Sequence, residues 1–374
     1  MIKLHIVFGA AFLSLVFSLG SCSVVPRNET AGNTGALSVM LWNVDNLFDG
    51  VDAGTEYDEY SVSAGWNEKK YAARILSISQ AIESAFEKDA SFVPADGSPP
   101  ALIGLVEVEN LEVLEDLASG SLAKYGYNWA FFGKLPEMAL GAGVLSRFPL
   151  DGTRVHSITA GGETTPRPVM EFRIESEGES IAFFLCHWKS KIGNDEATEA
   201  LRRSSARVIN RRLAEIRREE PDLPVIIMGD LNENHDEFYR VSGALVSALL
   251  PDDPWAASLS ASQNTRDFLV LSGKKPPQAS YFEKSFPVFY TPWGNELSEG
   301  SYYYKKDWET IDHFLLSAEL FNGKGWDFHN CRVLSRPPFI GAAGFPIAYT
   351  PRNGAGLSDH LPLMLYLKKA AADL

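Results

Sequence analysis

Residues 225–234 read VIIMGDLNEN, so an apolar run leads directly into an acid and an amide two positions apart. At the period of two that a strand imposes, Asp230 and Asn232 point to the same side of the chain. A carboxylate and an amide that leave the core together form an oxygen-rich corner, which suits a water molecule or a hard cation. Such a corner requires further polar groups from elsewhere in the chain.

Other apolar runs also end or begin in acids, amides and histidines. Taken singly, each such residue has an ordinary explanation as a turn residue, a helix cap or a packed histidine. Together they are hard to ascribe to capping, because buried carboxylates are costly unless they are paired or bind a metal. We therefore expect them to converge on one site. The residues with this placement are Asn43, Asp45, Glu107, His187, Asp230, Asn232, Asp312, Asp359 and His360.

The chemical types in this set indicate which cation they would hold. Oxygen ligands without thiolates, and too few histidines for a zinc cage, favour Mg²⁺, with Mn²⁺ or Ca²⁺ as alternatives. Magnesium binds through one or two carboxylates and completes its shell with water and substrate phosphate. The set therefore predicts a site for phosphoryl chemistry.

The elements that must position these residues are mostly strands. Helical patterns lie only at 68–86, 111–117 and 196–218, and residues 251–304 are typical of long loops with short elements. Because strands outnumber helices and do not alternate with them, we predict an α/β fold of two packed sheets with helices outside. One large domain over 37–370 accommodates it. The strand-like runs are ALSVMLWNVDN, ALIGLVEVEN, GAGVLSRFP, SIAFFLCHWKSK, PVIIMGDLNEN, TIDHFLLS and LSDHLPLMLYL.

The net charge limits the kind of partner that the chain can bind. With 34 basic and 48 acidic residues, the formal charge is −14, which argues against a broad basic face that grips nucleic acid. A nuclease is not excluded, because a bound cation or a local cluster can supply positive charge. Lysines that could guide a strand are Lys189, Lys191, Lys305 and Lys306.

The N-terminus is typical of an export signal. Lys3 precedes an apolar run that is short for a bilayer span, and Leu19-Gly20-Ser21-Cys22 resembles a bacterial lipoprotein signal. We expect a signal peptide at 1–21, lipidation of Cys22 and a flexible tether at 22–36, which together place a monomer on a membrane of the bacterial envelope. An ordinary signal peptide, or an anchor helix with an incidental cysteine, is the alternative. Beyond Cys22, only Cys186 and Cys331 remain, and we expect a buried free thiol rather than a bridge.

In their order along the chain, these motifs resemble the endonuclease/exonuclease/phosphatase superfamily, which includes deoxyribonucleases, inositol polyphosphate 5-phosphatases and neutral sphingomyelinases. The resemblance spans residues 37–367. It implies a four-layer α/β/β/α sandwich of two mixed sheets and a metal-dependent phosphoesterase. The motifs are WNVDNLF, GLVEVEN, GVLSRFP, CHWKSK, GDLNEN, TIDHFLLS and LSDHLP.

The resemblance also implies a role for each residue of the set. Glu107 would be the principal metal ligand, assisted by Asn43 or Asp45 and by Asp359. Asp230 would orient or deprotonate the attacking water. The roles at the phosphate would fall to Asn232 and His187 as donors, and to His360 with its tautomer fixed by Asp312.

Two substrate classes and one non-enzymatic function remain open. The leading hypothesis is a nuclease on DNA or RNA. The alternative is a phospholipid, phosphoinositide or sphingomyelin hydrolase, which the expected membrane anchor and the aromatic residues of 281–295 suggest. This alternative requires an exposed aromatic patch near the site, made by Phe286, Phe289, Tyr290 and Trp293. The third hypothesis is a binding lipoprotein that keeps the fold without catalysis.

Overall fold

The computed structural model describes most of the chain. The described residues are 20–24, 35–86, 98–136, 138–160, 163–165, 167–193, 195–283 and 286–370. Most of the expected signal peptide and most of the expected tether lie outside these ranges. Cys22 lies in a described strand, but its side chain is not described, so its lipidation stays a prediction.

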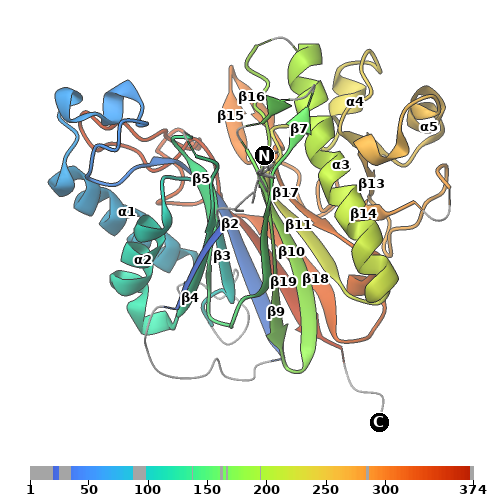
Figure 1. Cartoon of the computed structure of the whole chain (residues 1–374), viewed down its shortest axis with the longest axis horizontal. Helices are drawn as coiled ribbons and strands as arrows, with labels where there is room; N and C mark the ends of the chain where they lie inside the picture. Colours follow the sequence, from blue (N-terminus) through green and yellow to red (C-terminus); the bar gives the residue numbers. More distant parts are fainter. Residues whose placement is uncertain are drawn as a thin grey trace, which may run out of the picture.

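Within the described ranges, the fold is built on two large mixed sheets (Figure 1). The seven-stranded sheet has the order β1-β4-β5-β3-β2-β19-β18 and the eight-stranded sheet has the order β12-β13-β14-β17-β11-β10-β9-β6. The strands of the first are β1 (Gly20–Val24), β2 (Ala36–Leu47), β3 (Leu102–Val108), β4 (Trp129–Gly133), β5 (Gly141–Ser146), β18 (Trp326–Val333) and β19 (Leu363–Lys369). Those of the second are β6 (Asp151–His156), β9 (Val169–Ser176), β10 (Glu179–His187), β11 (Val225–Asp230), β12 (Leu249–Pro251), β13 (Leu269–Ser272), β14 (Val288–Tyr290) and β17 (Asp312–Leu316).

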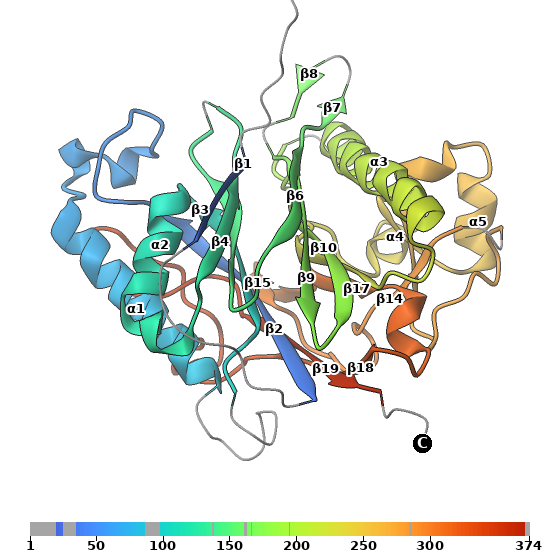
Figure 2. The same ribbon diagram turned by 60° about the horizontal axis from the view of Figure 1, so that its bottom comes forward.

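Helices cover the outer faces of the two sheets. Helices α1 and α2 lie on the seven-stranded sheet and α3 lies on the other, as both views show (Figures 1 and 2). Short helices and two small hairpins complete the described elements. These elements are α1 (Glu68–Phe86), α2 (Leu111–Ser119), α3 (Asp195–Glu219), α4 (Glu237–Arg240), α5 (Pro254–Ser260), β7 (Thr159–Ala160) with β8 (Glu163–Thr164), and β15 (Tyr302–Tyr304) with β16 (Asp307–Glu309).

Side-chain alternation along the central strands produces the layers. On β2, Val39 and Leu41 pack between the sheets, whereas Met40 and Trp42 pack under α1 and α2. Strand β10 does the same on the other sheet: Phe183 and Leu185 point inward, and Phe184 and Cys186 point toward α3. The four-layer α/β/β/α sandwich expected from the sequence is therefore confirmed.

The expected helices and most of the expected strands are present with small differences at their ends. In the two large sheets, the strands that the sequence patterns did not predict are β1, β4, β6, β9, β12 and β18. Strands β6 and β18 carry many polar residues, and their strand form follows from pairing with β9 and β19 rather than from an apolar run. Cys186 and Cys331 are buried and unpaired, as expected. None of the helices in the described ranges combines the length and apolar character needed to cross a bilayer.

Strand direction brings the predicted residues to one edge of the sandwich. Strands β2 and β3 are parallel, as are β10 and β11, so the C-terminal ends of each pair lie together. Strands β17 and β19 run antiparallel to β11 and β2 and begin at that same edge. The register pairs Asp230 with both His187 and Asp312. Residues more than three hundred positions apart in sequence are therefore neighbours there.

Candidate active site

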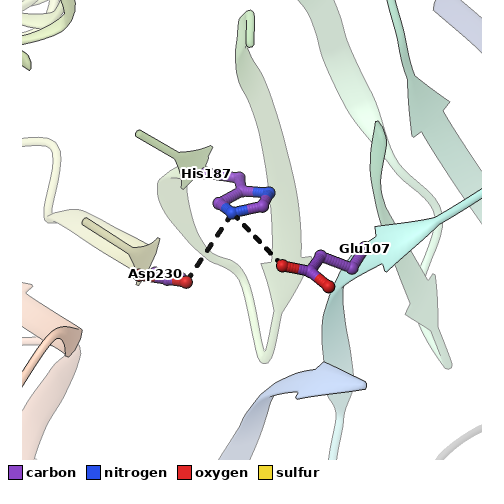
Figure 3. A group of neighbouring side chains, drawn as sticks. All are labelled: Glu107, His187 and Asp230. Atoms are coloured by element: carbon purple, nitrogen blue, oxygen red, sulfur yellow. Dashed lines mark ion pairs between the residues drawn. The ribbon is translucent and has the colours of Figure 1, made fainter. Parts of the chain in front are cut away.

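The centre of the site is formed by Glu107, His187 and Asp230 (Figure 3). The Nε2 atom of His187 lies 3.6 Å from Glu107 Oε1 and 3.6 Å from Asp230 Oδ2. Glu107 comes from the seven-stranded sheet, and the other two come from adjacent strands of the eight-stranded sheet. The two sheets therefore each contribute a carboxylate to one point.

Asn43 connects the two carboxylates. Its Nδ2 atom donates to Glu107 Oε1 and to Asp230 Oδ2, both at 3.1 Å, and lies 3.5 Å from His360 Nε2. Its Oδ1 atom accepts from the backbone N–H of Asp45 at 3.0 Å. In this arrangement Asn43 donates to carboxylates, and acting as a metal ligand through Oδ1 would require its amide to turn. Its role as a ligand stays a prediction.

His360 is held by Asp312. The Nδ1 atom of His360 lies 2.8 Å from Asp312 Oδ2, which also accepts from the Ser301 hydroxyl at 2.6 Å. The Nε2 atom faces the site, 3.9 Å from Asp230 Oδ2 and 3.9 Å from Asp359 Oδ1. A carboxylate on one ring nitrogen fixes the orientation of the ring and leaves the other nitrogen for the substrate.

Asp45 and Asp359 complete the acidic side of the site. Asn46 holds Asp45 and Glu107 together, because its Nδ2 donates to Asp45 Oδ1 at 2.9 Å and its backbone N–H donates to Glu107 Oε2 at 3.1 Å. Asp359 is half-buried beside His360. These carboxylates and the central groups open into one pocket of about 540 Å³.

The backbone is strained where it enters the site. Asp45, Asn46, Glu107 and Asn232 all have positive φ, between 51° and 66°, which is uncommon for residues other than glycine. Gly229 has φ of 145°, and a Cβ there would lie 1.9 Å from the Cys186 carbonyl oxygen. Only glycine therefore permits β11 to pair closely with β10 immediately before Asp230.

The two histidines have opposite protonation preferences. Burial, followed by the charges of Arg167, His360 and Lys189, holds the pKa of His187 well below its ordinary value. Burial also lowers the pKa of His360, but the carboxylates of Asp312, Asp359 and Asp230 outweigh it and raise this pKa well above the ordinary value. At neutral pH, His187 is therefore neutral and His360 is positively charged.

Two carboxyl groups of the site, those of Asp230 and Asp45, have pKa values near neutral pH. Burial, followed by the Asp312 carboxylate, raises the pKa of Asp230 to about 7. Burial, followed by the Asp359 carboxylate, raises the pKa of Asp45 to about 7. A base that titrates close to the working pH is well matched to accepting a proton from water.

The residues present fit a divalent cation. The ligand atoms of Glu107, His187 and Asp230 lie within 4.8 Å of one another, as do those of Asp230, Asp312 and His360. The donors are oxygens and imidazoles without thiolates, which suits Mg²⁺ or Mn²⁺. The second group is committed to the internal Asp312–His360 pair, so Glu107 with its neighbouring carboxylates is the better cation site.

Most of the site residues predicted from sequence come together. Asn232 lines the pocket, donates its backbone N–H to Asp230 Oδ1 at 2.9 Å, and donates Nδ2 to the Trp188 carbonyl at 3.1 Å. Asn43 and Asp312 lie just behind the pocket surface. Those that line the pocket directly are Asp45, Glu107, His187, Asp230, Asn232, Asp359 and His360.

Several pocket residues were missed by the sequence analysis. Arg167, from the loop before β9, donates to the Trp188 carbonyl beside His187. Tyr302 and Tyr304 come from the segment that the sequence indicated to be loops. Nothing in TTPRPV or SYYYKK marks these residues as functional, because only the tertiary fold places them at the site.

The predicted cationic guides are only partly available. Of the four lysines, Lys191 and Lys305 line the pocket. Lys191 is held by Glu237 at 2.7 Å and by Glu309 at 3.0 Å, so its charge is largely neutralised. Among the arginines and lysines that line the pocket, positive charge therefore comes mainly from Arg167 and Lys305.

Comparison with known proteins identifies the family. Residues 38–245 match the model of the Endonuclease/Exonuclease/phosphatase family, while a search of curated proteins found no match. Similar solved structures include the catalytic domain of human nocturnin with bound sulfate (16% identity, 89% of this chain and 93% of that chain, TM-score 0.49). A family member and a mannosyl-6-phosphatase, both from Bacteroides thetaiotaomicron, each share 16% identity at a TM-score of 0.46, over 89% and 88% of this chain and 97% and 99% of theirs.

At these identities and TM-scores, the solved structures add nothing about activity. The family model is decisive, because it matches more than half of the chain. The chain therefore belongs to the endonuclease/exonuclease/phosphatase family of phosphoesterases.

Proposed function

We propose that this chain is a divalent-metal-dependent phosphodiesterase that cleaves DNA or RNA. The observation that carries the proposal is the convergence of Glu107, His187 and Asp230 on one point, with the Asp312–His360 pair beside it. A pocket with carboxylates, a charged imidazole and an arginine at its mouth suits an anionic ester held next to a cation.

The cation would be held by Glu107, with Asp45 and Asp359 nearby. When bound, a divalent cation neutralises charge on the phosphate and stabilises the leaving oxygen. Mg²⁺ is the proposed ion, with Mn²⁺ or Ca²⁺ as alternatives, because carboxylates dominate the donor set.

Asp230 is the proposed base. Its Oδ1 atom is held by the backbone N–H of Asn232, and its Oδ2 atom faces His187 and His360 across the site. With a pKa of about 7, Asp230 is ionised in a large fraction of molecules near neutral pH and accepts a proton readily. A water molecule beside Oδ2 is thereby oriented and deprotonated as it attacks phosphorus.

The two histidines serve the phosphate from different protonation states. His360 is positively charged and donates from Nε2 to a non-bridging phosphate oxygen, where negative charge develops in the transition state. His187 is neutral and offers a single N–H as a hydrogen-bond donor to the phosphate or to the leaving oxygen. Asn232 lines the same pocket and is the proposed holder of a phosphate oxygen or the nucleophile, provided that its Nδ2 leaves the Trp188 carbonyl.

Lipid hydrolysis is less well supported than nucleic-acid hydrolysis. Phe289, Tyr290 and Trp293 are buried in the core, and Phe286 packs against Phe268. None of the four aromatic residues of the suggested lipid-binding patch lines the pocket. The feature that the lipid hypothesis required is therefore not found at the site.

Export and membrane anchoring through Cys22 are part of the proposal and rest on the N-terminal sequence alone. A monomer displayed on the bacterial envelope would meet nucleic acid outside the cytoplasm. Metabolic labelling with a fatty acid tests the anchor: wild type should incorporate label and Cys22→Ser should not. Equal labelling of both proteins would refute lipidation at this residue.

A substrate panel tests the proposed activity. The purified chain is incubated with plasmid DNA, RNA and sphingomyelin while Mg²⁺ is titrated, and EDTA is then added. We expect cleavage of DNA or RNA that requires the metal and stops with EDTA. Cleavage of sphingomyelin alone would refute the nuclease proposal, and no hydrolysis of any phosphate ester would favour a binding protein that keeps the fold.

A further inference from the structure

The hairpin β15–β16 contributes Tyr302, Tyr304 and Glu309 to the lining of the pocket. The ring of Tyr303 stacks on Phe345 with centroids 3.8 Å apart and contacts Trp308 at 5.1 Å. Trp308 in turn packs against the core between the seven-stranded sheet and helices α1 and α2. The side chains of Tyr303 and Trp308 therefore attach one face of this hairpin to the rest of the protein.

The hairpin is also bonded directly to the catalytic segment. The backbone N–H of Leu361 donates to the Ser301 carbonyl at 2.7 Å, and Tyr302 forms an antiparallel bridge with His360. The Ser301 hydroxyl donates to Asp312. The hairpin and the Asp312–His360 pair are therefore held in a fixed relation.

The opposite face of β15 presents two parallel aromatic rings to the pocket. Tyr302 and Tyr304 are two residues apart on a strand and so share a face. Their ring centroids are 6.0 Å apart at 17°, and the Tyr302 ring lies 4.6 Å from the imidazole of His360. A row of planar groups therefore extends from the catalytic imidazole outward along the pocket.

Core packing does not explain the outer ring of this row. Tyr304 is 47% exposed. Tyr303, which lies between Tyr302 and Tyr304 in sequence, is on the other face of the strand and packs inward. Lys305 lies 4.9 Å from the Tyr304 ring and follows it with φ of 49°, and Lys306 has φ of 75°. Lys305 and Lys306 form the two-residue turn of the hairpin, in which both central residues take positive φ, although Asn and Gly are more usual there than Lys.

The pocket has room for more than a phosphate group. A volume of about 540 Å³ is in the range of sites that hold a whole small molecule. Tyr302, Tyr304 and Lys305 line this pocket together with the catalytic groups. An aromatic surface beside a lysine is therefore available to the part of a substrate that is attached to the phosphate.

We propose that Tyr302 and Tyr304 form a stacking surface for the base of the nucleotide adjacent to the scissile phosphate, with Lys305 beside the next phosphate. This inference rests on the proposed nuclease function and specifies its substrate as unpaired nucleic acid, because a base must leave its duplex to lie on a ring. Stacking on an aromatic side chain accepts any base, so sequence preference is expected to be weak.

Binding in EDTA tests the stacking surface separately from hydrolysis. The full chain is titrated with a fluorescent single-stranded oligothymidylate, and with an abasic oligomer of the same length and charge, at one salt concentration. We expect wild type to bind the oligothymidylate about tenfold more tightly than the abasic oligomer. Tyr304→Ala should abolish this difference, and Tyr304→Phe should keep it. Tyr281→Ala is the matched control, because Tyr281 is 52% exposed and does not line the pocket.

The outcomes separate this inference from the proposed function. Equal affinity of wild type for both oligomers, a base preference that survives in Tyr304→Ala, or no binding of either oligomer would overturn the stacking surface. A base preference that Tyr304→Ala abolishes, without Mg²⁺-dependent cleavage of the same oligothymidylate, would support the surface and refute the nuclease. Mg²⁺-dependent cleavage of the oligothymidylate without a base preference in binding would support the nuclease and refute the stacking surface.

Discussion

The His360 side and the Glu107 side of the pocket are built differently. On the His360 side, Asp312 bonds the buried imidazole at 2.8 Å and is itself held by a hydrogen bond of 2.6 Å from the Ser301 hydroxyl. On the Glu107 side, a half-buried carboxylate sits on strained backbone, and His187 faces two carboxylate oxygens at 3.6 Å, beyond hydrogen-bond length. The first arrangement is pre-organised by the chain itself. The second is adapted to groups that approach from the pocket.

The protonation states follow the same division. Carboxylates raise the pKa of His360, while burial together with nearby cations lowers that of His187. Environments that move two like groups in opposite directions assign them different tasks. Under the proposed function, the His360 side would supply fixed positive charge to the phosphate, whereas the Glu107 side would hold the cation next to the leaving group.

Removing the proposed charge donor His360 or the proposed base Asp230 should have the largest effect. His360→Ala and Asp230→Ala are each expected to lower kcat by at least several hundredfold at saturating Mg²⁺, because each removes charge or proton transfer in the transition state. His329→Ala, at an exposed histidine on β18, is the control and should retain activity. Circular dichroism checks that the variants fold. Wild-type rates in both active-site variants would refute the assignment.

Asp312→Asn tests whether His360 depends on its carboxylate. The variant keeps the shape but removes the charge that raises the pKa of His360, so that pKa should fall. We expect kcat to drop by about a hundredfold and the alkaline limb of kcat/KM to move to lower pH. The pH profile is the measurement. Ser301→Ala, which keeps the carboxylate, should move the limb less, and an unmoved limb in Asp312→Asn would contradict the pairing.

Glu107→Gln tests the other side through its metal requirement. Loss of the principal carboxylate should raise the Mg²⁺ concentration for half-maximal activity by about 10- to 100-fold, and additional metal should restore part of the rate. Additional metal should not rescue His360→Ala. Asp151→Asn, at an exposed position on β6, is the matched control. Equal metal requirements in wild type and Glu107→Gln would exclude Glu107 as the principal ligand.

Protons and the divalent cation should compete for the carboxyl groups of the site. Asp45 and Asp230 have pKa values of about 7, so they are increasingly protonated as the pH falls below 7. Cation binding requires ionised carboxylates, and metal affinity should therefore fall between pH 7 and 5 by up to about tenfold per pH unit for each of these groups that must lose its proton. Calorimetry in buffers of different ionisation enthalpy measures the protons released. Binding without proton release near pH 6.5 would show that these carboxyl groups take no part.

The fold was largely predictable because its central strands are buried. The runs VIIM and IAFFLC are continuous and apolar, and the helix at 68–86 has its predicted ends. The strands that were missed, such as DGTRVH, carry polar residues, and pairing with a neighbour decides their conformation. Local sequence contains no signal for such pairing.

The site was predictable where chemistry coincides with a strand end. Asp230 and Asn232 both reach the pocket, as the period of two predicts, although Asn232 does so with φ of 51° outside the strand. Arg167 and Tyr304 lie in segments without a motif, and only the packing of loops against the sheet edge places them at the pocket. The acids, amides and histidines that come together at the pocket were therefore recognisable from sequence, whereas Arg167 and Tyr304 in its walls were not.

A Mn²⁺-soaked crystal, with anomalous scattering recorded, would show whether the Glu107 carboxylate holds the cation. We expect an anomalous peak in the pocket within coordination distance of this carboxylate, about 2.2 Å, and loss of that peak in Glu107→Gln. A peak elsewhere on the molecule, or an active enzyme whose pocket binds no metal, would contradict it.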